Sequence, residues 1–131
     1  MNLNAYKMDG LGNDFIIIDQ REKKITLSKD QIIKICNRSF AGCDQLILID
    51  KCSNSDAKLF FYNSDGSESG ACGNGTRCVA YFIGKEKNKK TIDLITISGK
   101  LKSKILYENL VETTIGQPKT NWNEFRITED I

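Results

Sequence analysis

The amino-acid sequence predicts an α+β domain in which a mainly antiparallel β-sheet packs around a central helix. Short apolar runs rich in β-branched residues recur along most of the 131 residues, whereas a helical spacing of apolar residues occurs in only two places. We therefore expect about seven strands and two helices. Their order shows no regular β-α-β rhythm, which favours antiparallel pairing. A chain of this length fits one domain with a real hydrophobic core.

The first half of the chain is expected to supply four of the strands and one helix. The strands are predicted at residues 6–8, 15–19, 46–49 and 59–62. Residues 9–14 contain two glycines and are interpreted as a loop between the first two strands. Residues 28–31, Ser-Lys-Asp-Gln, match a capping box that begins a helix. Four apolar side chains follow at helical spacing and are expected to face the core: Ile32, Ile35, Cys36 and Phe40.

The second half begins with a turn at residues 63–66, Asn-Ser-Asp-Gly, and a Ser/Gly-rich loop that runs to Gly75. A second helix follows, and its buried face is expected to carry Val79, Phe82 and Ile83. Gly84 and the lysine-rich run 85–90 are predicted to end this helix, where positive charge suits the negative end of the helix dipole. A meander of three antiparallel strands completes the domain, at residues 91–98, 100–107 and 110–115.

The end of the chain has no clear periodicity. A Gly-Gln-Pro segment at residues 116–118 interrupts the strand pattern, and the residues after it match neither a strand nor a helix. We therefore assign residues 1–117 to the domain and residues 118–131 to a linker that leaves it.

The composition excludes several classes of function. The net charge is only +2 and no basic stripe with interleaved aromatic residues is present, so we expect neither nucleic acid nor a membrane as partner. No apolar run is long enough for a membrane span or a signal peptide, which predicts a cytoplasmic protein with reduced cysteines. The absence of histidine excludes Ser-His-Asp and Cys-His catalysis within this chain. With five cysteines but no C-x-x-C pair, no metal site is expected.

The most unusual segment is residues 69–78, Ser-Gly-Ala-Cys-Gly-Asn-Gly-Thr-Arg-Cys, in which Cys72 lies at the junction between a loop and a helix. The N–H groups in the first turn of a helix lack internal partners and bind anions such as a substrate carboxylate. The flanking glycines allow a ligand to approach the backbone. The same positive helix end stabilises the thiolate of an adjacent cysteine, which makes Cys72 a candidate catalytic base.

From residue types alone, each candidate site residue also has a purely structural interpretation. The spacing around Cys72 matches neither a Walker P-loop nor G-x-G-x-x-G, and a lone cysteine in a reduced protein is most often a small core residue. Cys78 lies on the expected buried face of the helix and is assigned to the core. For Asn13 the structural alternative is a loop cap, for Asn63 a turn residue, and for Gln45 an exposed polar side chain.

Several segments of the chain resemble the diaminopimelate epimerase family. They are residues 7–15 (Lys-Met-Asp-Gly-Leu-Gly-Asn-Asp-Phe), residues 42–46 (Gly-Cys-Asp-Gln-Leu), and residues 63–68 (Asn-Ser-Asp-Gly-Ser-Glu) running into residues 71–78. The Cys-Gly-Asn-Gly-x-Arg-Cys motif is highly specific. The resemblance implies one half of a two-domain fold, with the active site between the domains and the second domain missing here. The family usually has histidine at the position of Asp9.

The resemblance also implies a reaction. Such an enzyme is an isomerase that interconverts LL- and meso-diaminopimelate in lysine and peptidoglycan precursor synthesis, without pyridoxal phosphate, metal or other cofactor. One cysteine thiolate removes the α-proton, and a second cysteine, from the missing domain, delivers a proton to the opposite face. Cys72 corresponds to one of this pair. The implied substrate-binding groups are the side chains of Asn13, Gln45 and Asn63 and the N–H groups of Gly73 and Asn74.

Two other functions remain open on the sequence. A proline or hydroxyproline racemase shares the fold and the two-cysteine mechanism but does not normally carry the Gly-Asn-Gly form of the motif. A non-catalytic binding module would be marked by loss of Cys72, which is present. Asp44 and Arg77 are interpreted as a structural ion pair that holds the loop. A homodimer is compatible with the sequence, and the chain by itself is expected to be inactive.

Overall fold

The structure, a computed structural model, describes residues 5–10, 12–70, 72–107 and 110–115. Within these residues, one eight-stranded sheet has the order β1-β2-β3-β4-β6-β7-β8, and β5 pairs with β4 off this path. The strands are β1 (Ala5–Gly10), β2 (Asn13–Asp19), β3 (Gln45–Asp50), β4 (Ala57–Asn63), β5 (Glu68–Ser69), β6 (Thr91–Thr96), β7 (Gly99–Tyr107) and β8 (Leu110–Ile115). The helices are α1 (Lys29–Cys36) and α2 (Gly73–Lys87). The predicted linker at residues 118–131 lies outside the described residues.

The strand pairing confirms a mainly antiparallel sheet. The pairs β1–β2, β3–β4, β4–β5, β6–β7 and β7–β8 are antiparallel, whereas β2–β3 and β4–β6 are parallel. Each parallel pair is joined by a crossover that contains a helix, because parallel neighbours cannot be joined by a tight turn. The chain thus contains two separate β-α-β crossovers and no regular β-α-β rhythm, as expected. Helix α1 connects β2 to β3, and α2 lies in the connection from β4 to β6.

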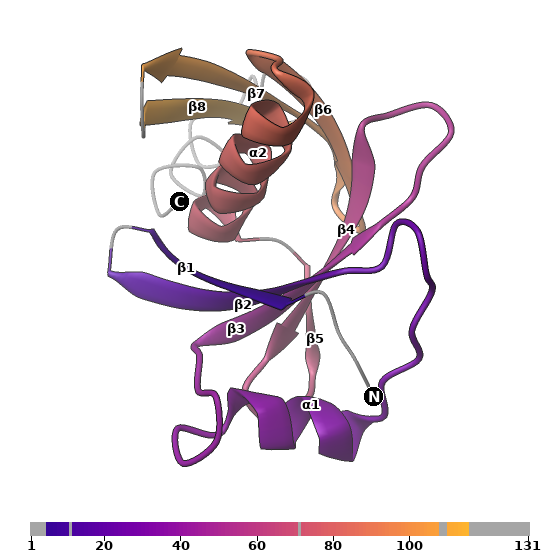
Figure 1. Cartoon of the computed structure of the whole chain (residues 1–131), viewed down its shortest axis with the longest axis vertical. Coiled ribbons are helices and arrows are strands. Elements are labelled where there is room, and N and C mark those ends of the chain that lie inside the picture. The colour runs from indigo at the N-terminus through magenta and orange to yellow at the C-terminus, as the bar shows by residue number, and fades with distance from the viewer. Residues whose placement is uncertain (1–4, 11, 71, 108–109, 116–131) are drawn as a thin grey trace, which may run out of the picture.

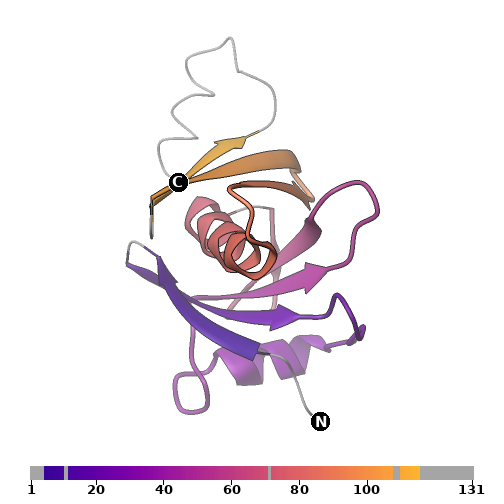
Figure 2. The same ribbon diagram turned by 45° about the horizontal axis from the view of Figure 1, so that its top comes forward.

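The two helices cover opposite faces of the sheet. Figures 1 and 2 show the sheet curling around α2, with α1 on the outer side near β3. In β2, Phe15 and Ile17 pack inward with α2, whereas Ile16 and Ile18 belong to the outer cluster with α1. This double cover explains why β2 and β3 are continuous apolar runs rather than alternating ones. The predicted central helix is confirmed: it is α2, in which Val79, Ala80 and Ile83 are fully buried.

The β1–β2 hairpin is tighter than expected. Asp9 pairs with Asp14 and Gly10 with Asn13, so most of the predicted loop belongs to the two strands. Gly12, at the tip, has φ +90°, a conformation that glycine adopts without steric penalty. The hairpin therefore places Asn13 at the very start of β2.

Two helix boundaries differ from the prediction. The Ser28 capping box is present, but α1 ends at Cys36, and Phe40 is 65% exposed rather than in the core. Helix α2 continues through Gly84 and ends at Lys87, within the lysine-rich run predicted to end it, and its C-cap Asn88 adopts the left-handed conformation with φ 53°. A Cβ on Gly84 would collide with Ile105 of β7, so this glycine serves close packing instead of ending the helix. In the described residues, no helix is long and apolar enough to cross a bilayer.

Candidate functional site

Cys72 is the N-cap residue of α2, at the loop-to-helix junction expected from the sequence. Its carbonyl accepts hydrogen bonds from the N–H of Thr76 at 2.9 Å and from Thr76 Oγ1 at 2.8 Å. Its sulfur accepts a hydrogen bond from the N–H of Gly75 at 3.4 Å. The side chain is half-buried, so the thiol is fixed at the helix terminus and still reachable.

The first turn of α2 leaves donors available for an anion. It contains no acidic side chain, and the first-turn N–H groups of any helix have no partner inside the helix. The N–H of Gly75 donates to the Cys72 sulfur. Among the described residues, the N–H groups of Gly73 and Asn74 have no protein acceptor. These two N–H groups point from the positive end of the helix dipole and suit a carboxylate.

Gly75 has a packing role that sequence analysis did not find. A Cβ at this position would lie 2.8 Å from Ile47 Cδ1, 3.2 Å from a ring carbon of Phe61 and 3.3 Å from one of Phe15. All three neighbours belong to the inner core cluster. The glycine therefore lets the N-terminus of α2 sit directly on strands β2, β3 and β4, which brings Cys72 to the end of these strands.

The three predicted amide residues lie at one end of three neighbouring strands. Gln45 pairs in register with Asn63, and Phe15, two residues after Asn13, pairs with Gln45. Because strand side chains alternate between faces, all three amides extend the inward rows that pack against α2. The Nε2 of Gln45 donates to Oδ1 of Asn63 at 3.0 Å. In β2, β3 and β4, the side chains that face α2 are therefore apolar along the strand, and the last one, at the end where α2 begins, is an amide.

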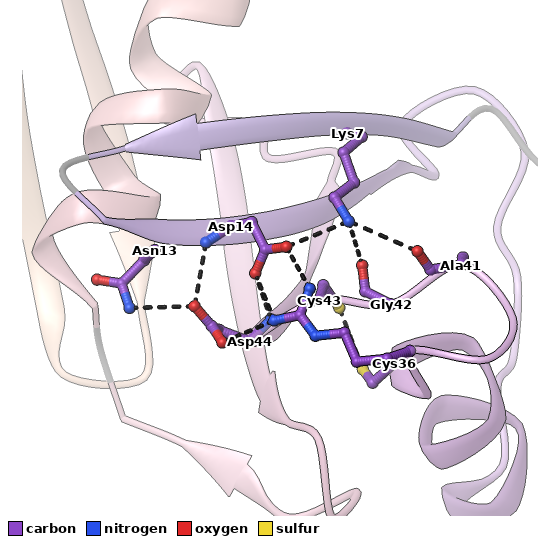
Figure 3. Close-up of polar contacts among 9 residues, drawn as sticks. Lys7, Asn13, Asp14, Cys36, Ala41, Gly42, Cys43 and Asp44 are labelled. Atoms are coloured by element: carbon purple, nitrogen blue, oxygen red, sulfur yellow. Dashed lines mark hydrogen bonds and ion pairs between the residues drawn. The ribbon is translucent and has the colours of Figure 1, made fainter.

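Asn74 connects this row to the helix. Its Nδ2 donates to Oδ1 of Asn13 at 2.8 Å, and its own Oδ1 accepts a hydrogen bond from the Arg77 guanidinium. The Nδ2 of Asn13 donates to Asp44 Oδ2 at 3.4 Å (Figure 3). The predicted ion pair between Asp44 and Arg77 was wrong: Asp44 pairs with Arg38 at 2.9 Å. The two charged groups are instead the ends of a chain of hydrogen bonds that passes through two amides.

Sequence analysis missed the charged cluster that supports Asn13. Asp14 accepts hydrogen bonds from Arg38 at 2.9 Å and forms an ion pair with Lys7 at 3.2 Å. Hydrogen bonds from Arg38, then from the N–H of Asp44 and from Lys7, hold the pKa of the Asp14 carboxyl well below its usual range. Asp14 and Arg38 are 24 residues apart, and no local pattern predicts their contact. A surface cavity of about 420 Å³ here is lined by Asp9, Gly12, Asn13, Asp14, Arg38 and Asp44.

The other cysteines lie in different surroundings. Cys36, Cys43 and Cys78 are buried, as predicted for Cys36 and Cys78, and the Sγ atoms of Cys36 and Cys43 are 3.4 Å apart. Burial raises the pKa of Cys43 to about 12 and that of Cys78 to about 11. Cys52 is half-buried and donates to Asn54 Oδ1 at 3.0 Å. Of the five thiols, only that of Cys72 lies at a helix N-terminus.

Several known proteins are similar to this chain in sequence. A family model described as "Diaminopimelate epimerase" matches residues 5–121. A diaminopimelate epimerase of Pelagibacter ubique is 64% identical over 131 residues, which are 100% of this chain and 48% of that protein. One from Phenylobacterium zucineum is 40% identical over 124 residues, 94% of this chain and 45% of that protein. The chain therefore spans about half the length of the curated relatives it matches.

Solved structures with low sequence identity show the same fold. A methylitaconate-delta-isomerase has a TM-score of 0.62 at 18% identity and covers 91% of this chain and 66% of its own. A hydroxyproline epimerase from Agrobacterium vitis has a TM-score of 0.55 at 14% identity, over 77% of this chain and 36% of its own. At this identity the likeness concerns the fold alone, a curled sheet around one helix.

Proposed function

The chain belongs to the diaminopimelate epimerase family, and we propose that it supplies one half of the active site that interconverts LL- and meso-diaminopimelate. The observation that supports this most directly is the position of Cys72. Cys72 is the N-cap residue of α2, and it lies beside the first-turn N–H groups of the helix and near the amide side chains at the ends of the strands. A base, a carboxylate site and neutral polar contacts are the groups that inversion of an amino-acid α-carbon requires.

In the proposed mechanism Cys72 acts on one face of the substrate. Its thiolate takes the α-proton, or its thiol delivers one, while a cysteine outside this chain acts on the opposite face. The α-C–H is a weak acid, so negative charge that develops toward the carboxylate must be stabilised. We assign this role to the N–H groups of Gly73 and Asn74 in the first turn of α2, since preorganised donors are most effective where charge develops in the transition state. This step uses no pyridoxal phosphate or metal.

The amides are proposed to hold the rest of the molecule. Diaminopimelate carries an ammonium and a carboxylate at each end, so its site must both donate and accept hydrogen bonds. The side chains of Asn13, Gln45 and Asn63 can do either without placing a net charge beside the thiolate. We also propose that the protein acts in the cytoplasm, where free thiols stay reduced, and contributes to lysine and peptidoglycan precursor synthesis.

The experiment joins this chain to the part of the Pelagibacter ubique relative that it does not match. Exchange of the α-hydrogen in heavy water is followed with LL- and meso-diaminopimelate resolved by chromatography, and trans-4-hydroxyproline serves as the control substrate. We expect turnover of diaminopimelate by the joined protein and none by residues 1–131 alone. One thiol serves one face, and a single group would return the proton to the face it left.

Two results would contradict the proposal. Turnover of hydroxyproline but not diaminopimelate by the joined protein would assign a different racemase activity. Full inversion by residues 1–131 alone, abolished by Cys72→Ala, would show that the second cysteine is not needed.

A further inference from the structure

We propose that Asp44 is a positioning residue that fixes how the amide of Asn13 is turned toward substrate. The inference rests on the proposed function, because it takes Asn13 to be a substrate contact. It concerns a residue that touches Asn13 and not the reacting atoms.

The orientation of two amides follows from the chemistry at the ends of the hydrogen-bond chain. The guanidinium of Arg77 can only donate, so Oδ1 of Asn74 must face it. Nδ2 of Asn74 is then the group that donates to Oδ1 of Asn13 at 2.8 Å. At the other end the carboxylate of Asp44 can only accept, which agrees with Nδ2 of Asn13 facing it at 3.4 Å. All hydrogen bonds in the chain therefore run in one direction, from the cation to the anion.

Asp44 is held independently of Asn13. Its Oδ1 accepts from Arg38 at 2.9 Å, and its Oδ2 accepts from the N–H of Asp14 at 3.2 Å. Its own N–H donates to Asp14 Oδ1 at 2.9 Å. The carboxylate is thus anchored to the β1–β2 hairpin and to the loop after α1, and it offers Asn13 a fixed acceptor (Figure 3).

The orientation of the Asn13 amide determines which group of the substrate it can bind. Its oxygen is engaged by Asn74 and one Nδ2 hydrogen by Asp44. Among the described residues, the second Nδ2 hydrogen has no acceptor. Asn13 therefore presents its second N–H as a donor, which suits a carboxylate of the substrate. An amide free to flip would present its oxygen part of the time and would bind the carboxylate more weakly.

The test is a double-mutant cycle in the active joined protein. At 3.4 Å the contact with Asp44 is long, so we expect Asp44→Ala to raise KM about threefold to tenfold while kcat changes less than about twofold. In an Asn13→Ala background the same substitution should leave KM unchanged, because the group that Asp44 orients is gone. Asp44→Glu keeps both carboxylate oxygens as acceptors and should restore KM to within about twofold of the parent.

Two further variants keep the test decisive. Asp50→Ala removes a carboxylate from the other end of β3, where it pairs with Lys24 at 3.7 Å, and should leave KM unchanged. If Asp44→Ala does not fold, Arg77→Met breaks the chain at its other end and should show the same non-additivity with Asn13→Ala. Additive effects, or no rescue by Asp44→Glu, would overturn the positioning role and leave Asp44 a partner of Arg38. An inactive parent protein would instead overturn the proposed function itself.

Discussion

The two helices of this chain begin in different ways. At the start of α1, Ser28 Oγ accepts the N–H of Gln31 at 3.1 Å, and Gln31 Oε1 accepts the N–H of Ser28 at 2.8 Å. Asp30 adds a negative charge in the same turn. At the start of α2, Cys72 offers only a sulfur acceptor at 3.4 Å, and the first turn carries no acidic side chain.

The α1 terminus stabilises its own helix, whereas the donors at the α2 terminus are those that we propose to bind substrate. A capping box satisfies orphan N–H groups reciprocally, and a first-turn carboxylate interacts favourably with the helix dipole. Helix α2 has neither a capping box nor a carboxylate in its first turn. Its N-terminus is instead held by packing, since Gly75 lies against the inner core of the sheet. Packing can therefore replace capping at a terminus that is proposed to bind substrate.

The largest expected effect comes from replacing each N-cap residue in the joined protein. Cys72→Ala should lower the rate of α-hydrogen exchange by about a thousandfold, because it removes the group proposed to move the proton. Ser28→Ala should lower the free energy of unfolding by about 1 kcal/mol and leave the exchange rate within about twofold of the parent. Exchange kinetics and urea unfolding measure both quantities. A Cys72→Ala protein that keeps more than about a tenth of the rate would falsify the assignment of the base.

A second test compares the thiols. Cys72 should be alkylated about a hundredfold faster than Cys43 and Cys78, because burial raises the pKa of both and leaves little thiolate near pH 8. Labelling of the two buried cysteines should increase with pH, since their thiolates form only as the pH approaches their raised pKa values. A short iodoacetamide pulse with mass-spectrometric mapping measures the order. Cys52, half-buried but away from a helix N-terminus, is the control, and equal labelling of all five thiols would contradict a higher reactivity of Cys72.

The smallest expected effect concerns the third position of each helix. Gly75→Val should lower the free energy of unfolding by about 2 kcal/mol, because the added atoms would press on Ile47, Phe61 and Phe15. Gln31→Ala at the matching position of α1 removes only half of a solvent-exposed capping box and should cost about 0.5 kcal/mol. Urea unfolding followed by circular dichroism compares the two variants. Equal losses would mean that packing does not hold the N-terminus of α2.

Local patterns were sufficient for most elements and for the position of Cys72. The capping box at Ser28, the buried strand that begins near Phe15 and the helix start after Cys72 depend on neighbours within a few residues. Side-chain periodicity and helix-end chemistry act over that range, so they can be recognised in the sequence. Phe40 shows the limit of periodicity: its spacing fits a helix, but the backbone has already left α1 at Asn37.

Only the tertiary structure decided how the candidate site is assembled. Asn74 and Asn13 are 61 residues apart and meet because α2 lies inside the curl of the sheet. Asp44 and Arg77, expected to pair directly, are joined through these two amides instead. The sequence also did not predict the parallel pairing of β2 with β3 or the close packing of β7 against Gly84. The physical reason is that such contacts depend on strand register and helix placement, which the whole core determines together and no short segment encodes.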